Sequence, residues 1–293
     1  MRGASVAAVG ILTGWGEGPT VLPDDAGQAS QGRRVIALTP RPRGAERLRR
    51  VTRECLLGID AVEAMLREAG LERDAIGGHR TAFVYVTAGA YGAANRAFIE
   101  ALVPGRALHF PYTAPSAVPA EVAIEFRLTG PYVILIGGAT ATIDALWQAT
   151  TFVARGAADR AIVLAVETFG ECADLYGRAR WLVGRPLTEA AACALIVTGD
   201  AAPVYQPVLT SAPPAGPEDP GAAGPTPEEI ARHRAGETLA CGPLIALALG
   251  RAGGGPLAVS GEWRGRRAAL GWAGPAGGSK PTTLVDELRA SAG

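Results

Sequence analysis

The segment LIGGATATIDAL, residues 135–146, has the form of a turn on which enzymes often carry a nucleophile. Five apolar residues (132–136) precede two glycines, and a helix-compatible run of small residues (139–149) follows them. This order predicts a buried strand, a tight turn and a helix. The N–H groups at a helix N-terminus favour negative charge, which suits a nucleophile placed there. The first residue after the glycines is Ala139, however, and alanine has no nucleophilic group.

The other polar residues near this turn do not form an alternative catalytic set. Thr140 and Thr142 are weak nucleophiles, and the sequence places no histidine or lysine near them, so we expect them to cap the helix that follows. His109 is one of three scattered histidines, and we expect a surface or core position for it instead of metal binding or catalysis. Asp144 lies in the first helical turns, where a carboxylate suits the helix dipole.

The cysteine and glycine patterns indicate no metal or cofactor site. Four scattered cysteines without a CxxC pair predict neither a zinc site nor a disulfide framework. We expect each thiol to be a small buried group in a reducing cytosol, at Cys55, Cys172, Cys193 and Cys241. The glycine-rich segment 250–256 follows a predicted helix and precedes a predicted strand, which is the wrong order for a phosphate-binding loop.

Composition and charge narrow the class of protein. Of 293 residues, 48% are hydrophobic and 19% charged, so the chain is expected to fold as a globule. The 28 basic and 28 acidic residues balance, which argues against nucleic acid or an anionic membrane as a partner. No segment reaches the roughly 20 apolar residues that span a bilayer, and the N-terminus lacks the apolar run of a signal peptide. We therefore expect a cytoplasmic location.

Predicted strands and helices alternate along the chain, which indicates a layered α/β fold. The Pro/Gly-rich segment 211–227 is expected to be an exposed loop, and Arg264-Gly265 is expected to turn a closing hairpin. The basic segment 41–54 is expected to be a solvated helix start, or else to meet an acidic partner. Hydrophobic patterning predicts strands at 6–12, 81–87, 132–136, 161–166 and 188–200, and helices at 55–68, 93–103, 120–127, 139–149 and 239–250.

The order of these segments resembles the ketosynthase family of the thiolase fold. The resemblance covers most of residues 4–273 and implies a layered α-β-α-β-α fold with an N-terminal half (1–199) and a shortened C-terminal half (200–293). Glu167 and Glu189 resemble the structural glutamates of the family, which accept hydrogen bonds from backbone N–H groups. The segments that carry the likeness are VAAVGILTGWG, FPYTAPSAVPAEVAIEFRLTGP, ARGAADRAIVLAVET, TEAAACALIV and GETLACGPLIALALG.

The chain departs from this family where the family carries its chemistry. Counted from Gly130-Pro131, the family's cysteine falls at Ala139, and Glu237 stands where the second histidine of the family would be. A ketosynthase needs the thiolate to hold the acyl chain and the histidines for decarboxylation and oxyanion stabilisation. Residues 200–236 are too few to contain the segment that carries the first histidine. The chain is therefore expected to have no catalytic residues and not to be an enzyme by itself.

This pattern resembles the chain-length factor, the non-catalytic partner of a type II polyketide ketosynthase, and the shortening resembles the compact factors of polyene-making systems. The resemblance implies a heterodimer with a catalytic ketosynthase, which acts on chains bound to an acyl carrier protein, without a metal or cofactor of its own. It also implies that one strand pairs with its counterpart across the interface: Tyr132, Val133, Ile134, Leu135 and Ile136.

The resemblance further implies that side chains of this subunit close the far end of the partner's acyl tunnel. Tyr91, Asn95 and Phe98 share one helical face and are our lining candidates, with Tyr112 and Thr113 as further ones. The alternative is that Tyr91 and Phe98 are ordinary core or homodimer residues. Two other functions remain open: a hydrolase or cyclase that acts through Thr140, and a homodimeric scaffold without a polyketide role.

Overall fold

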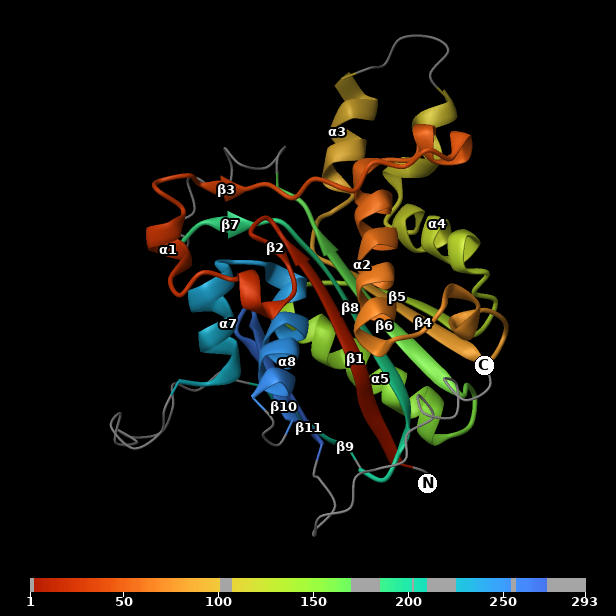
Figure 1. Cartoon of the computed structure of the whole chain (residues 1–293), viewed down its shortest axis with the longest axis vertical. Coiled ribbons are helices and arrows are strands. Elements are labelled where there is room, and N and C mark those ends of the chain that lie inside the picture. The colour runs from red at the N-terminus through yellow and green to blue at the C-terminus, as the bar shows by residue number, and fades with distance from the viewer. Residues whose placement is uncertain are drawn as a thin grey trace.

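The computed structural model of the chain describes residues 3–100, 107–169, 185–201, 203–209, 225–253 and 257–272 (Figure 1). The principal sheet has six strands in the order β2-β1-β8-β6-β4-β5. β4 runs parallel to β5 and β6, whereas β8 runs antiparallel to β6 and β1. The strands are β1 (Gly3–Thr13), β2 (Gly16–Glu17), β4 (Thr81–Thr87), β5 (Tyr132–Ile136), β6 (Arg160–Glu167) and β8 (Ala190–Gly199).

The central strands are apolar along their whole length because helices cover both faces of the sheet. Every residue of β4 is buried, and seven of the eight residues of β6 are buried. On one face lie α2 (Arg53–Ala69) and α4 (Ala117–Phe126), which share one hydrophobic cluster with the strands. α2 ends at Gly70, whose positive φ of 65° allows the left-handed conformation that closes the helix.

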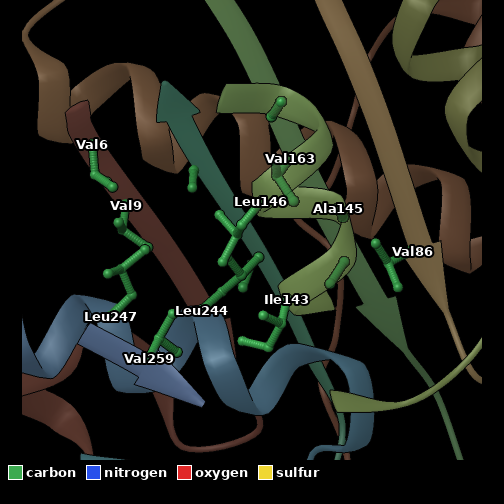
Figure 2. Close-up of a cluster of buried hydrophobic side chains, with 14 of the residues drawn as sticks. Val6, Val9, Val86, Ile143, Ala145, Leu146, Val163, Leu244, Leu247 and Val259 are labelled. Carbon is green, nitrogen blue, oxygen red and sulfur yellow. The ribbon is translucent and has the colours of Figure 1, made fainter. Parts of the chain in front are cut away.

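Two helices lie between the principal sheet and a second, smaller sheet. α5 (Ala139–Ala154) and α8 (Gly242–Ala252) pack against both sheets, and their side chains meet those of β1, β4, β6 and β10 in one core (Figure 2). The second sheet is antiparallel with the order β10-β11-β9, formed by β10 (Leu257–Trp263), β11 (Arg266–Trp272) and β9 (Pro203–Leu209). Arg264 and Gly265 both have positive φ and turn the predicted hairpin.

The remaining elements are short or lie at the periphery. The sequence patterns did not predict β9 or α7, while the expected loop at 211–227 and the C-terminal tail lie almost wholly outside the described residues. The short or peripheral elements are η1 (Pro19–Val21), α1 (Ala26–Ala29), β3 (Val35–Ile36), η2 (Glu46–Arg50), η3 (Arg73–Ile76), α3 (Gly92–Glu100), η4 (Ala107–Thr113), β7 (Leu187–Thr188), α7 (Pro227–Ala235) and η7 (Leu239–Cys241).

The layers follow the expected order of helix, sheet, helix and sheet. On the outward face of the second sheet, Ala258, Glu262 and Arg267 are exposed, so the described residues fill four of the five expected layers. This is consistent with a shortened second half, although the division at residue 199 stays a prediction. None of the helices in the described ranges combines the length and the apolar character needed to cross a membrane.

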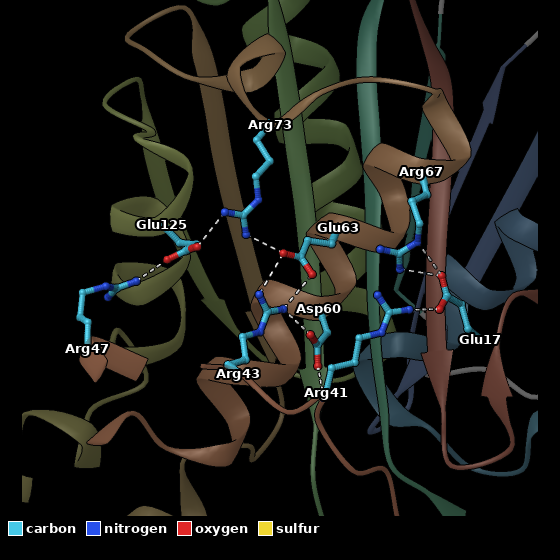
Figure 3. Close-up of polar contacts among 9 residues, drawn as sticks. All are labelled: Glu17, Arg41, Arg43, Arg47, Asp60, Glu63, Arg67, Arg73 and Glu125. Atoms are coloured by element: carbon cyan, nitrogen blue, oxygen red, sulfur yellow. Dashed lines mark hydrogen bonds and ion pairs between the residues drawn. The ribbon is translucent and has the colours of Figure 1, made fainter. Parts of the chain in front are cut away.

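The basic segment 41–54 meets acidic groups of its own chain. Neither sequence interpretation is complete, because four arginines of the segment, Arg41, Arg43, Arg47 and Arg53, pair with carboxylates elsewhere in this chain. Most of the ion pairs bind the segment to β2, α2 and α4 (Figure 3). The pairs are Arg41 with Glu17, Arg43 with Asp60 and Glu63, Arg47 with Glu121 and Glu125, and Arg53 with Glu189.

Candidate functional site

The turn between β5 and α5 has the predicted strand–turn–helix form. The Gly137 N–H donates to the Thr87 carbonyl over 2.9 Å, which ties the turn to the end of β4. Gly138 packs against the indole of Trp263, and a Cβ built at Gly138 would lie 2.4 Å from the ring. Only glycine fits at this position while Trp263 stays in place. Trp263 comes from the end of β10, so no local sequence pattern predicts this contact.

The helix that follows is not capped by the threonines, contrary to the expectation from the sequence. Gly138 is the N-cap of α5 and makes no side-chain capping hydrogen bond. The buried Thr142 hydroxyl instead donates to the Ala240 carbonyl over 2.6 Å and so joins α5 to η7. The Asp144 carboxylate accepts a hydrogen bond from the Tyr205 hydroxyl of β9, a contact that links α5 to the second sheet.

A pocket of about 980 Å³ opens beside this turn, with Ala139 on its wall. Glu237 lies on the wall of the same pocket, so the structure brings together the two positions that differ from the catalytic pattern. The described lining residues are Ala88, Ala139, Arg185, Thr226, Glu228, Glu229, Ala231, Arg232, Gly236, Glu237, Thr238, Leu239, Gly242, Pro243, Ser260, Gly261, Glu262, Trp263, Arg264 and Arg267.

The acidic side chains of the pocket are held by neighbouring groups. Glu237 accepts a hydrogen bond from the Leu239 N–H over 3.0 Å and lies 3.7 Å from the Arg232 guanidinium. Glu228 accepts from the Ser260 N–H, and Glu229 completes a capping box at the start of α7. Glu262 pairs with Arg267. These carboxylates therefore stabilise the pocket wall, and none is arranged as an acid/base pair.

The described part of the lining holds no cysteine, histidine or lysine. Thr140, the nucleophile of the alternative hydrolase hypothesis, is also not among the lining residues. His79 and His233 are exposed, and the side chain of His109 lies outside the described residues. Within the described ranges, no cluster of three His, Cys, Asp or Glu side chains is placed to hold a metal ion. The described lining therefore offers the hydroxyls of Thr226, Thr238 and Ser260 but no thiol, and no imidazole or lysine amine that could activate a hydroxyl.

The thiols near the core are inert. Cys55, Cys193 and Cys241 are buried, as expected, while Cys172 lies outside the described residues. Burial raises the pKa of Cys55 to about 12 and raises the pKa of Cys241 well above its ordinary value. The thiolate is the reactive form of cysteine, so these groups are poor nucleophiles at neutral pH.

Glu167 and Glu189 are structural, as the family resemblance implied. Glu167 is fully buried and accepts hydrogen bonds from the N–H groups of Ala88 and Gly89. Burial raises its pKa to about 8, although these hydrogen bonds favour the ionised form. Burial would also raise the pKa of Glu189, but hydrogen bonds from Arg53 and from two backbone N–H groups hold it below the ordinary value.

β5 is an edge strand with an apolar surface. Tyr132 and Ile136 are 45% and 52% exposed, while the three residues between them pack partly into the cores on the two faces of the sheet. Beyond β5, the described residues supply no further strand. The edge strand β9 differs, because Pro203 and Pro207 remove backbone donors from it. An unprotected apolar edge is open to pairing with another chain.

The five tunnel candidates lie together on α3, the residue before it, and η4, which project from the principal sheet (Figure 1). No residue of α3 is buried, and the Phe98 ring lies 5.7 Å from that of Phe110. Tyr91, Asn95 and Phe98 are half-buried, so Tyr91 and Phe98 do not belong to the core of this chain. Tyr112 donates to Glu121, and Thr113 donates to the Phe110 carbonyl. None of the five lines the Ala139 pocket.

Comparison with known proteins identifies the family. The N-terminal domain of β-ketoacyl synthases matches residues 41–194, which is more than half of the chain. The chain therefore belongs to the β-ketoacyl synthase family. No curated protein matches it.

Solved structures share the fold at low sequence identity. The ishigamide ketosynthase/chain length factor is 15% identical with a TM-score of 0.67, and the match covers 92% of this chain and 99% of that one. A structure of a type II PKS acyl-carrier protein in complex with its ketosynthase (AntDE:AntF) is 12% identical with a TM-score of 0.71, and the match covers 93% of this chain and 99% of that one. The ketosynthase ApeO with its chain length factor ApeC from Xenorhabdus doucetiae is 12% identical with a TM-score of 0.57, and the match covers 92% of this chain and 100% of that one. These likenesses confirm the thiolase-like fold.

Proposed function

We propose that this chain is a non-catalytic chain-length factor that forms a heterodimer with a catalytic ketosynthase. The observation that carries the proposal is the pocket beside Ala139, which keeps a shaped cavity at the nucleophile turn but has no described thiol, imidazole or amine in its lining. Acyl transfer needs a nucleophile and a proton-transfer group within hydrogen-bond reach. The chemistry would then come from the cysteine of the partner subunit.

The exposed strand β5 supports an obligate partner. Its five side chains, Tyr132 to Ile136, are apolar, and the outer two are about half exposed. A partner strand would satisfy the free N–H and C=O groups of this edge and bury these side chains together. Obligate interfaces bury more than about 2,000 Å² in total, so further surface must join β5 in the interface.

The apolar surface of α3 and η4 supports a role in setting product length. Ile99 and Phe110 are 64% and 63% exposed, and the Phe98 ring packs on Phe110 at the same place. In the proposed complex these rings close the far end of the partner's acyl tunnel, where a longer chain would clash with them. Substrates would be polyketide chains of the polyene type carried by an acyl carrier protein that docks mainly on the partner, in the cytoplasm.

The alternative functions receive less support from the structure. A hydrolase or cyclase would need Thr140 in the pocket beside a base, and Thr140 is absent from the described lining. A homodimeric scaffold would also use β5, because a free edge pairs with a second copy as readily as with a different chain. The identity of the partner therefore separates the scaffold from the chain-length factor.

Co-expression tests the proposed function. The chain expressed alone is expected to be insoluble or self-associated, because β5 stays unpaired. Co-expression with a cysteine-bearing ketosynthase encoded beside it is expected to give a soluble 1:1 complex, measured by light scattering after size-exclusion chromatography. The complex should extend carrier-bound chains only while the partner's cysteine is intact. A stable, soluble monomer that binds no ketosynthase contradicts the proposal.

Phe98→Ala in this complex is expected to lengthen the main product by at least about one ketide unit, because removing a ring from the tunnel end relieves the clash with longer chains. Mass spectrometry of the released products measures the distribution. Val204→Ala is the control and should leave the distribution unchanged, since Val204 is an apolar residue, 53% exposed, on β9 of the second sheet. An unchanged distribution in Phe98→Ala, with normal complex formation, shows that the tunnel assignment is wrong.

A further inference from the structure

α3 has little packing of its own to determine its direction. It buries no residue, and among the described elements η4 is the one against which it packs extensively. The chain enters α3 from the end of β4 through residues 88–91. The conformation of this connection therefore decides where Tyr91, Asn95 and Phe98 point.

Side chains from two neighbouring strands hold the connection. β4 and β6 are parallel, so the last residues of both, Thr87 and Glu167, lie at the same edge of the sheet. Glu167 accepts hydrogen bonds from the Ala88 N–H over 2.5 Å and from the Gly89 N–H over 3.2 Å. The Thr87 hydroxyl oxygen accepts from the N–H groups of Gly89 and Ala90 over 3.2 and 2.9 Å.

These hydrogen bonds form one buried unit. The Thr87 hydroxyl lies 3.4 Å from Glu167 and donates to it, and both side chains are fully buried. Three consecutive amides, those of residues 88 to 90, thus have their acceptors within this pair. The Ala240 N–H also donates to Glu167, and Ala240 in turn accepts from Thr142 of α5. The same carboxylate therefore links the base of α3 to η7, whose Leu239 lines the Ala139 pocket.

We propose that Glu167, together with Thr87, is a positioning residue that fixes the direction of α3 and thereby places the chain-length side chains. The link to chain length rests on the proposed function, whereas the effect on α3 does not. Glu167 does not touch a substrate in this arrangement. It acts through the Ala88 and Gly89 amides, for which it is a buried acceptor, while Thr87 accepts from the Gly89 and Ala90 amides.

Hydrogen exchange and product analysis of the heterodimer test the proposal. Above the Glu167 pKa of about 8, where the carboxylate is ionised, Glu167→Gln keeps the size but replaces one acceptor oxygen with a donor, so an amide at 88 or 89 loses its partner. Exchange of the amides of residues 91–100 is expected to become roughly tenfold faster, as for the loss of one buried hydrogen bond. The product distribution should broaden while total turnover stays within about twofold, because the partner's active site is not touched.

Matched variants separate positioning from general damage. Glu189→Gln changes another buried carboxylate, whose hydrogen-bond donors are Arg53 and the N–H groups of Leu38 and Phe169. It should leave α3 exchange unchanged. Thr87→Val should speed the hydrogen exchange of the α3 amides as Glu167→Gln does. Thr87→Ser keeps the hydroxyl, so the α3 amides should exchange at the rate of the unaltered chain.

Unchanged α3 exchange in both Glu167→Gln and Thr87→Val overturns the proposal. Equal loosening in Glu189→Gln also overturns it, because the effect would then be general. Faster α3 exchange with an unchanged product distribution supports the positioning of α3 and instead contradicts the chain-length role of Tyr91, Asn95 and Phe98. The two failures are therefore distinguishable.

Discussion

Ile136→Asp is expected to prevent stable association of the chain with the proposed ketosynthase partner. Ile136 is the last residue of the edge strand β5 and is 52% exposed in the isolated chain. At a paired strand, the new carboxylate would be buried without a counter-charge. The cost of about 3 kcal/mol or more corresponds to at least roughly a hundredfold rise in Kd.

Co-purification followed by analytical ultracentrifugation measures this effect. Val204→Asp is the matched control, because Val204 is 53% exposed on another edge strand, β9. β9 contacts β1, which lies four places from β5 in the principal sheet, and prolines protect its edge. Association should survive in the control. If Ile136→Asp binds the ketosynthase as tightly as the unaltered chain, β5 is not the interface.

Arg43→Met is expected to destabilise the chain by about 3 kcal/mol, the cost of leaving a buried charge without its partner. The Arg43 guanidinium pairs with both Asp60 and Glu63 (Figure 3), and the side chains of Arg43 and Asp60 are only 14% and 2% exposed. Methionine keeps the apolar contacts of the arginine stem but supplies no charge. Urea unfolding of the complex or of the solubilised chain measures the loss.

Arg47→Met is the matched control for this effect. Arg47 also bridges two carboxylates, those of Glu121 and Glu125, but its side chain is 42% exposed. Exposed ion pairs contribute about 0–1 kcal/mol, so its loss should be small. Equal destabilisation by both variants would show that burial of the Arg43 cluster does not determine its strength.

The same cluster predicts that the stability of the fold depends on pH in the acid range. Burial tends to raise the pKa of Glu63, but its ion pairs with Arg43 and Arg73 hold the pKa below the ordinary value of 4.5. A carboxyl with a lowered pKa in the folded state stabilises the fold above its unfolded pKa, and this stability is lost as the pH falls through the folded value. As the pH falls below about 5, the free energy of unfolding should therefore decrease less in Arg43→Met than in the unaltered chain.

Local patterns in the sequence predicted most of the elements in the first two hundred residues. The predicted strands 81–87 and 132–136 have the bounds of β4 and β5, because uninterrupted apolar runs between glycines or charged residues end where the buried sheet ends. β9 was not predicted, since PVYQPVL contains two prolines and lacks a clear alternation. α7 is polar around most of its surface and shows little helical periodicity, although its Thr226-x-x-Glu229 capping box was a usable signal.

The candidate site was predicted in part. The absence of a nucleophile at Ala139 follows from the sequence alone. The family resemblance implied Glu237, and the structure adds Trp263 to the same site. These residues come from a connection and a strand about a hundred residues or more along the chain, so short-range spacing holds no information about their meeting. The prediction that the threonines cap α5 was wrong, because Thr142 instead donates its hydroxyl to the Ala240 carbonyl, a tertiary acceptor.

The sequence by itself determined that position 139 carries no thiol, because the residue there is alanine. It also determined the buried strands and the helices beside them, because the period of apolar residues reports local burial. Only the tertiary structure decided that β5 lies at an edge, that Arg41, Arg43 and Arg47 pair within the chain, and that Glu167 accepts hydrogen bonds from Ala88 and Gly89. These features depend on which segments meet in space, and the free energy that selects those meetings comes from packing and hydrogen bonding between distant residues.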